Sequence, residues 1–309
     1  MTQISVLIPV YNVQAYLSEC LDSLLAQDFQ DWEAICVNDG STDNSLQILN
    51  EYVSKDPRFK IISQTNQGLS AARNAALEVA TGNWIIFLDS DDMLVRNALS
   101  TLYRVAQESD QPVIVPTSFG SIGQDNTAPT TDYKICQPAL ETLLKNPRGY
   151  SSACGKLYRA DILKGRRFIP GIYFEDWPFI VTLFAYIPSF ASINNKLYLY
   201  RQADGSIVRS AFSAHKIDSY IIGMQFVKEQ LGNTPFATLA KKRCSVAMRM
   251  CINKTWRDKE HRKILAPHLV KQIQAAHQKG YFSWKYISLK TIARYLVMKY
   301  LYNQSKESL

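Results

Sequence analysis

Three carboxylates follow an apolar segment in the first third of the chain. Residues 84–88 read Trp-Ile-Ile-Phe-Leu, which is typical of a strand buried on both faces, and Asp89, Asp91 and Asp92 come directly after it. Carboxylates at positions i and i+2 on the loop that leaves a strand can converge on one hard cation. Mg²⁺ and Mn²⁺ are usually held by one or two carboxylates, while substrate phosphates fill the remaining positions. Because Asp-x-Asp triplets also arise by chance in surface loops, the surrounding elements decide what this one indicates.

The elements around the triplet alternate between strand and helix. The pattern predicts strands at residues 4–10, 32–38, 60–63 and 84–88, with helices at 16–25, 46–53 (N-cap at Thr42 or Asp43) and 70–80 between them. This order predicts an α/β fold with a doubly wound, Rossmann-like and mostly parallel sheet. Parallel strands joined by right-handed crossovers place all their carboxyl ends at one edge, where open α/β sheets bind ligands.

Polar residues gather at that predicted edge. Tyr11 and Asn12, Asp39, residues 66–73 and residues 89–92 each follow a predicted strand. Carboxylates together with one arginine suit a nucleoside diphosphate and its metal, since Asp39 can accept from a base or ribose and Arg73 can pair with phosphate. The structural alternatives are a turn or helix cap at Asp39 and a solvated helix face at Arg73.

Four segments resemble the family 2 glycosyltransferases of the GT-A fold, the type that builds bacterial cell-surface polysaccharides. They are Val6–Asn12, Val37–Asp43, Asn66–Asn74 and Leu88–Asp92. The resemblance is closest over residues 4–95 and extends to about residue 210. It implies a nucleotide-sugar donor, expected to be a UDP-sugar, a divalent cation (Mn²⁺ or Mg²⁺) as cofactor, and inversion at the anomeric carbon.

The resemblance also implies roles for single residues in the donor site. The residue matching Asp39 contacts the base, the one matching Arg73 lies near the diphosphate, and the one matching Asp89 faces the ribose. Asp91 matches the usual metal ligand. The expected donor-site residues are Pro9, Tyr11, Asn12, Asp39, Asn66, Gly68, Arg73, Asp89, Ser90 and Asp91.

A second acidic pair, Glu175-Asp176, stands among aromatic and apolar residues. Such surroundings raise the pKa of a carboxylate, which suits a general base. The resemblance assigns the role of catalytic base to Asp176, and the alternative is a pair of helix N-terminal carboxylates favoured by the helix dipole. Further candidates for acceptor or phosphate contacts are Asp92, Glu175, Trp177, Arg201 and His215. The segment 200–207 resembles the one that closes over the donor in the family, whereas a lone histidine such as His215 is more often structural.

Charge divides the chain unevenly. Residues 241–309 carry 16 Lys/Arg against 3 Asp/Glu, a net charge of +13, whereas the remainder carries a net charge of −5. We expect three regions: a nucleotide-sugar-binding half at residues 1–115, an acceptor and catalytic-base half at 116–210, and a basic helical extension at 211–309. The basic region indicates an anionic partner. The aromatic and basic residues between Tyr281 and Tyr302 suit an anionic membrane surface, and the alternative is a helix that packs on the body with a solvated basic face. No nucleic-acid-binding motif accompanies these charges.

Other features bear on location and on rival functions. The expected location is the cytoplasm, peripherally on the inner face of the cell membrane, because the sequence lacks a signal-peptide pattern and an apolar run of about 18 residues. The six cysteines lack C-x-x-C spacing and are expected to be buried free thiols. A glycoside hydrolase would not need the metal triplet, and a nucleotidyltransferase making nucleotide sugars would carry a glycine-rich loop after its first strand. A non-catalytic, membrane-associated nucleotide-binding scaffold would not need Asp91 and Asp176.

Overall fold

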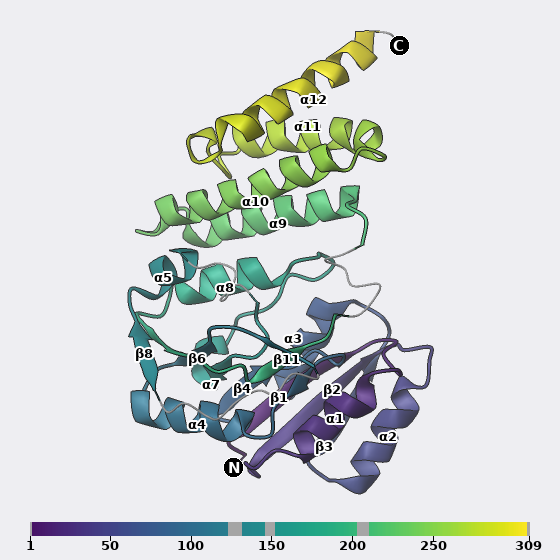
Figure 1. Ribbon diagram of the computed structural model, residues 1–309, viewed down its shortest axis with the longest axis vertical. Helices are drawn as coiled ribbons and strands as arrows, with labels where there is room; N and C mark the ends of the chain where they lie inside the picture. The colour runs from purple at the N-terminus through teal and green to yellow at the C-terminus, as the bar shows by residue number, and fades with distance from the viewer. Residues whose placement is uncertain (1, 123–131, 146–151, 203–209, 308–309) are drawn as a thin grey trace. The chain divides into compact units, whose positions relative to one another are not determined.

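The chain forms two compact units (Figure 1). The computed structural model describes residues 2–122, 132–145, 152–202 and 210–307. The first unit contains residues 1–171 and 186–204, and the second contains residues 172–185 and 205–309. The division into three functional regions stays a prediction.

The core of the first unit is a parallel sheet with hydrophobic strands. Strands β1 (Ile4–Val10), β2 (Trp32–Asp39), β3 (Phe59–Gln64) and β4 (Trp84–Phe87) pair in the order β3-β2-β1-β4. Every residue of β1, β2 and β4 is buried, as expected where helices cover both faces of a sheet. The connecting helices are α1 (Leu17–Leu25), α2 (Ser45–Lys55) and α3 (Leu69–Val79). The predicted doubly wound, mostly parallel fold is confirmed.

The sheet continues beyond β4 with mixed pairing. Strand β9 (Leu157–Arg159) is antiparallel to both β4 and β6 (Val113–Pro116), so it separates the two parallel parts. Strands β10 (Phe190–Ile193) and β8 (Tyr133–Cys136) complete the eight strands. A small second sheet joins β5 (Met93–Leu94), β11 (Tyr198–Tyr200) and β7 (Gly120–Ser121). The other helices of this unit are α4 (Ala98–Ser109), α5 (Ala139–Lys145) and α7 (Ala160–Leu163).

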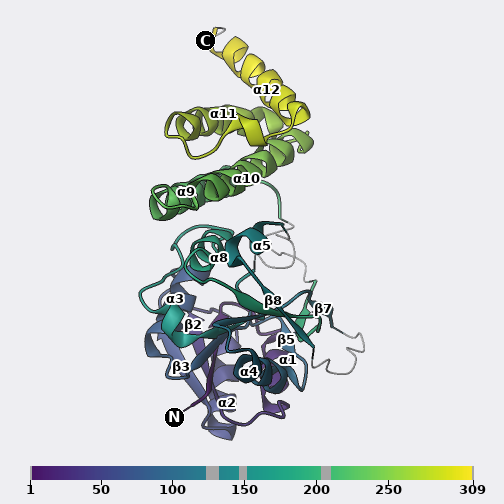
Figure 2. The ribbon, with the colours of Figure 1, turned by 90° about the vertical axis from the view of Figure 1, so that its left-hand side faces the viewer.

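The second unit is helical. Its helices are α8 (Asp176–Phe184), α9 (Ala214–Leu231), α10 (Ala237–Arg257), α11 (Arg262–Gln278) and α12 (Leu289–Glu307). Helices α9 and α10 lie side by side, α11 packs against both, and α12 packs against α10 and α11 (Figure 2). The predicted helical extension is confirmed, but helix does not run through residues 281–302. A short 3₁₀ turn, η1 (Trp284–Tyr286), precedes α12: Gly280 follows α11 with a positive φ of 69°, and the Ser283 side chain caps the turn by accepting from the Lys285 N–H. No helix among the described residues is long and apolar enough to cross a membrane.

Candidate active site

Two loops at the carboxyl edge of the sheet are tied together by the side chain of Asn12. Asn12 follows β1 and has a positive φ of 50°, a conformation that asparagine tolerates better than most residues. Its Oδ1 accepts from the Thr42 backbone N–H at 2.7 Å, and its own N–H donates to Ser41 Oγ at 3.2 Å. Tyr11 beside it remains 48% exposed, whereas Pro9 is buried in β1 opposite Val37.

Asp39, the last residue of β2, holds the loop that leads into α3. Its carboxylate accepts from Gln64 Nε2 at 2.7 Å, from the Gln67 N–H at 2.9 Å and from the Gly68 N–H at 2.8 Å. Gly68 has a φ of 87°, which favours glycine, and Asn66 in the same loop is exposed. Asp39 is only 2% exposed, and because a carboxylate has about four acceptor positions, these three donors leave one of them unfilled.

Arg73 and Asp89 form a contact between α3 and the acidic loop. Arg73 Nη2 donates to Asp89 Oδ1 at 2.7 Å and to Cys154 Sγ at 3.4 Å, while the guanidinium lies 5.2 Å from the centre of the Phe168 ring. The Arg73 side chain is only 1% exposed, so a solvated helix face at this position is excluded. Asp89 is 33% exposed and is therefore accessible to a ligand.

The other two carboxylates of the loop have different surroundings. Asp92 is buried, and it accepts from Tyr198 Oη at 2.6 Å and from the Arg201 N–H at 2.7 Å. Burial and the charge of Asp89 raise the pKa of Asp92 to about 8. Asp91 is half-buried, and its carbonyl oxygen accepts from Arg201 Nε at 2.8 Å. Asp92 and Arg201 thus fix the shape of the loop, and Asp91 stays partly exposed within it.

The acidic loop has the donor set that a hard cation prefers. Burial and the charge of Asp89 raise the pKa of Asp91, so a cation near both carboxylates would relieve their repulsion. Within the described residues, no cluster of three or more His, Cys, Asp or Glu could hold a metal alone. Two carboxylates nevertheless fit Mg²⁺ or Mn²⁺, since phosphate oxygens and water supply the remaining ligands.

Ser90 is buried within the acidic loop. The predicted residues that remain belong to the second unit. Asp176 is the first residue of α8 and Glu175 is its N-cap, so both lie where the helix dipole favours a negative charge. Trp177 is 4% exposed and packs against Gly223 of α9, and the ring of His215 lies 4.6 Å from the centre of the Tyr173 ring. Residues 205–207 of the expected closing segment lie outside the described residues.

Several residues at the site have no signal in the sequence. Tyr198 lies 106 positions from Asp92, yet its hydroxyl donates to Asp92 and accepts from the Asp89 N–H. Glu19 of α1 accepts from Arg201, and Cys154 contacts Arg73. Contacts over such separations follow from the tertiary arrangement of β11 and α1, and no local pattern indicates them.

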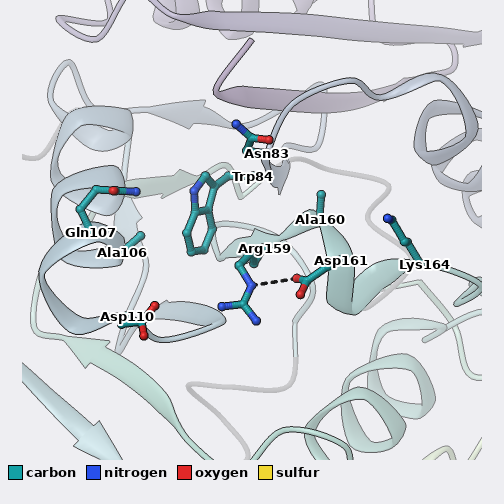
Figure 3. A pocket seen from close by; sticks show the side chains of 9 residues that line it. All are labelled: Asn83, Trp84, Ala106, Gln107, Asp110, Arg159, Ala160, Asp161 and Lys164. Carbon is teal, nitrogen blue, oxygen red and sulfur yellow. Dashed lines mark hydrogen bonds and ion pairs between the residues drawn. The ribbon is translucent and has the colours of Figure 1, made fainter. Parts of the chain in front are cut away.

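A cavity of about 500 Å³ lies elsewhere on the first unit (Figure 3). Trp84, the first residue of β4, lines it, so this cavity is at the amino end of that strand. Arg159 and Asp161 form an ion pair at 2.8 Å inside it. None of the expected donor-site residues lines this cavity, and the candidate site is therefore the carboxyl edge.

Comparison with known proteins bears on the family and the fold. The model of the family described as "Glycosyl transferase family 2" matches residues 5–166. The glycosyltransferase GlyG of Streptococcus pneumoniae is 32% identical over 222 residues, which are 68% of this chain and 74% of GlyG. The glycosyltransferase GlyA of Streptococcus pneumoniae is 35% identical over 67% of this chain and 32% of GlyA, and the putative glycosyltransferase EpsH of Bacillus subtilis is 34% identical over 67% of this chain and 62% of EpsH.

Solved structures share the fold. The crystal structure of residues 1–349 of S. aureus TarS in complex with UDP-GlcNAc has a TM-score of 0.71 at 21% identity, covering 99% of this chain and 92% of that one. The mannosyltransferase PcManGT from Pyrobaculum calidifontis, in complex with GDP-Man and Mn²⁺, has a TM-score of 0.59 at 16% identity, covering 97% of this chain and 80% of that one. At these identities the likeness establishes a GT-A type of fold.

Proposed function

Because the chain belongs to glycosyl transferase family 2, we propose that it transfers a sugar from a nucleoside-diphosphate donor to an acceptor hydroxyl, with inversion at the anomeric carbon. We propose a UDP-sugar carrying a hexose or an N-acetylhexosamine as the donor. The complex of TarS with UDP-GlcNAc supports this choice of nucleotide. The acceptor is a growing surface glycan or a lipid-linked glycan.

The observation that carries this proposal is the contact of Arg73 with Asp89. A buried arginine at 2.7 Å from a partly exposed carboxylate brings a cationic and an anionic group to one edge of the sheet. A nucleotide sugar needs both, because its diphosphate pairs with cations and its ribose hydroxyls donate to carboxylates. Asp39 provides a further acceptor for the base, and Tyr11, Asn12, Asn66 and Ser90 complete the proposed donor site.

We assign the general base to Asp176. In the proposed reaction its carboxylate takes the proton of the acceptor hydroxyl, and the oxygen then forms a bond to the anomeric carbon as the bond to the diphosphate breaks. A single displacement of this kind inverts the configuration. Its aromatic and apolar neighbours in the sequence, Tyr173, Phe174 and Trp177, support the role, because such surroundings favour a general base, and Asp176 itself is partly buried. Glu175, Trp177, Arg201 and His215 are proposed contacts of the acceptor or phosphate.

A divalent cation would be held by Asp91, with Asp89 beside it. When bound, it neutralises negative charge on the leaving diphosphate. Arg73 supplies a fixed positive charge from the protein itself, and Asp92 keeps the loop in shape through Tyr198 and Arg201. The like charges of Asp89 and Asp91 support this assignment, because the two carboxylates repel each other unless a cation lies near them.

We extend the proposal to the cellular location. The net charge of +13 on residues 241–309 supports peripheral binding to an anionic membrane surface on the cytoplasmic side. An enzyme that extends a lipid-linked acceptor would meet its substrate there.

A donor screen tests the proposal. Purified protein with Mn²⁺ is incubated with a panel of UDP-, GDP- and dTDP-sugars, and the release of nucleoside diphosphate is measured. Release from a UDP-sugar is expected. Formation of pyrophosphate from a nucleoside triphosphate and a sugar phosphate would indicate a nucleotidyltransferase, and nucleotide binding without any turnover would indicate a scaffold.

A further inference from the structure

The last helix of the second unit, α12, has apolar side chains on two opposite sides. Tyr295 and Met298 are buried on the inner side, where α12 packs against α10 and α11. Five large apolar residues on the other side are exposed, and we call them the outer face: Leu289 (83%), Leu296 (54%), Val297 (45%), Tyr300 (63%) and Leu301 (56%). A helix at the surface of a soluble unit normally has one apolar side only. The outer face therefore requires a partner.

Positive charge surrounds the outer face. The segment from Tyr281 to Lys306 contains five Lys/Arg residues and no Asp or Glu. At about 100° per residue, Arg294 lies along one margin of the outer face and Lys299 along the other, while Lys290 falls on the face itself, near its Arg294 margin. In the described part of this segment, no lysine or arginine forms an ion pair, and Arg294 donates to the amide oxygen of Asn253 instead. The face is thus apolar in the middle and cationic at both margins.

This charge pattern selects between partners. Two copies joined through the outer face would bring lysines against lysines, which is unfavourable. An anionic lipid leaflet is complementary, because apolar side chains enter the acyl region while lysines reach the phosphates. Building on the membrane association proposed above, we propose that the outer face of α12 docks on an anionic phospholipid bilayer and that a groove beside it takes one lipid.

The groove has a volume of about 480 Å³ and lies between α11 and α12. Its lining includes Ile273, Gln274, His277, Trp284, Leu296 and Lys299. Leu296 belongs to both the groove and the outer face, so the groove opens beside the docking surface. Mostly apolar walls with a few polar groups are typical of small-molecule sites. The apolar wall suits the start of a lipid chain, and Lys299 with His277 suits its phosphate.

Vesicle flotation of the full-length protein tests this proposal. The vesicles contain phosphatidylcholine alone or phosphatidylcholine mixed with phosphatidylglycerol. We expect flotation with the anionic vesicles only, weakened by salt. The double variant Leu289→Glu/Tyr300→Glu should lower partitioning at least roughly tenfold, because it removes two apolar contacts and adds two negative charges. The matched control is Ile264→Glu on α11, which changes a residue that is 75% exposed and outside the outer face.

A single substitution at Lys299 tests the groove between α11 and α12. Lys299→Gln should lower the preference for anionic over neutral vesicles, while Lys259→Gln, a change of the same charge outside the groove, should leave it unaltered. Three outcomes would overturn the proposal: no flotation of the wild type at low salt, equal flotation of the double variant, or a dimer in sedimentation that the double variant abolishes. Binding of UDP in solution, measured on the same variants, should be unchanged. If the wild type does not bind UDP, that result would count against the proposed function and would leave the docking of α12 on the membrane unaffected.

Discussion

Replacing Asp39 gives the sharpest test of how the carboxyl edge is built. In Asp39→Asn, one oxygen still accepts from Gln64 and Gln67, but the new amide group meets the Gly68 N–H, which then faces a donor. An unsatisfied buried donor costs about 1–3 kcal/mol, so we expect a loss of about 2 kcal/mol in the free energy of unfolding. Asp39→Ala removes all three contacts, and we expect about 3 kcal/mol because the exposed Gln67 N–H can turn to water.

Urea unfolding followed by circular dichroism measures these losses, and calorimetry measures UDP binding. Asp31→Asn is the control, since Asp31 is an exposed carboxylate directly before β2 that accepts from the Gln3 N–H. It should change the free energy by less than about 0.5 kcal/mol. For Asp39→Asn, UDP affinity should fall roughly tenfold, as expected for a lost charged hydrogen bond. An unchanged unfolding midpoint would refute the loop contacts, and an unchanged UDP affinity would refute the role in binding.

Three further predictions concern the metal, pH and the second unit. Asp91→Ala, or excess chelator, should abolish transfer and weaken nucleotide-sugar binding, and full activity in chelator would exclude the metal role. Hydrogen bonds from Lys60, Ser5 and Thr81 outweigh burial and lower the pKa of Glu33 from 4.5 to about 2. Because the unfolded chain takes up this proton first, about 3 kcal/mol of stability present above pH 4.5 should be lost as the pH falls to about 2. Acid titration of Glu33→Gln should lack this loss, and a variant that matches the wild-type curve would contradict it. Gly223→Ala should lower the thermal midpoint of the second unit, since its Cβ would lie 2.6 Å from a Trp177 ring carbon, and an unaltered midpoint would contradict the packing.

The sequence predicts the first four strands closely because their pattern is local. The predicted strand at 4–10 coincides with β1. The other three predicted strands differ from β2, β3 and β4 by no more than one residue at either end. Strand β9 escapes prediction because three residues directly before α7 carry no periodicity, and because its antiparallel pairing with β4 and β6 is a tertiary contact. The described C-terminal helices follow from their apolar spacing, but the apolar and aromatic pattern continues across the break before α12, where Gly280 with a positive φ and the Ser283 cap interrupt the helix.

The candidate site divides in the same way. The order of the strands predicts that Arg73 and Asp89 meet at one edge, and the structure brings them to 2.7 Å. The contacts that surround each of these side chains cannot be predicted from the neighbouring sequence. Tyr198 and Arg201 hold Asp92 although they lie more than 100 positions away in the sequence. The sequence indicates for Asp39 either a contact to a base or a turn at residues 39–43, whereas in the structure its carboxylate accepts from the loop before α3.

A comparison of Asp176→Asn with the wild type tests most directly whether this chain transfers sugars with Asp176 as the base. The substitution keeps the shape of the side chain and removes its basicity. Binding of the UDP-sugar is measured by calorimetry, and turnover by release of UDP in the presence of acceptor. We predict unchanged donor affinity and a turnover lowered roughly 10²-fold or more. Wild-type turnover in the variant, or an equal loss of binding and turnover, would contradict the assignment.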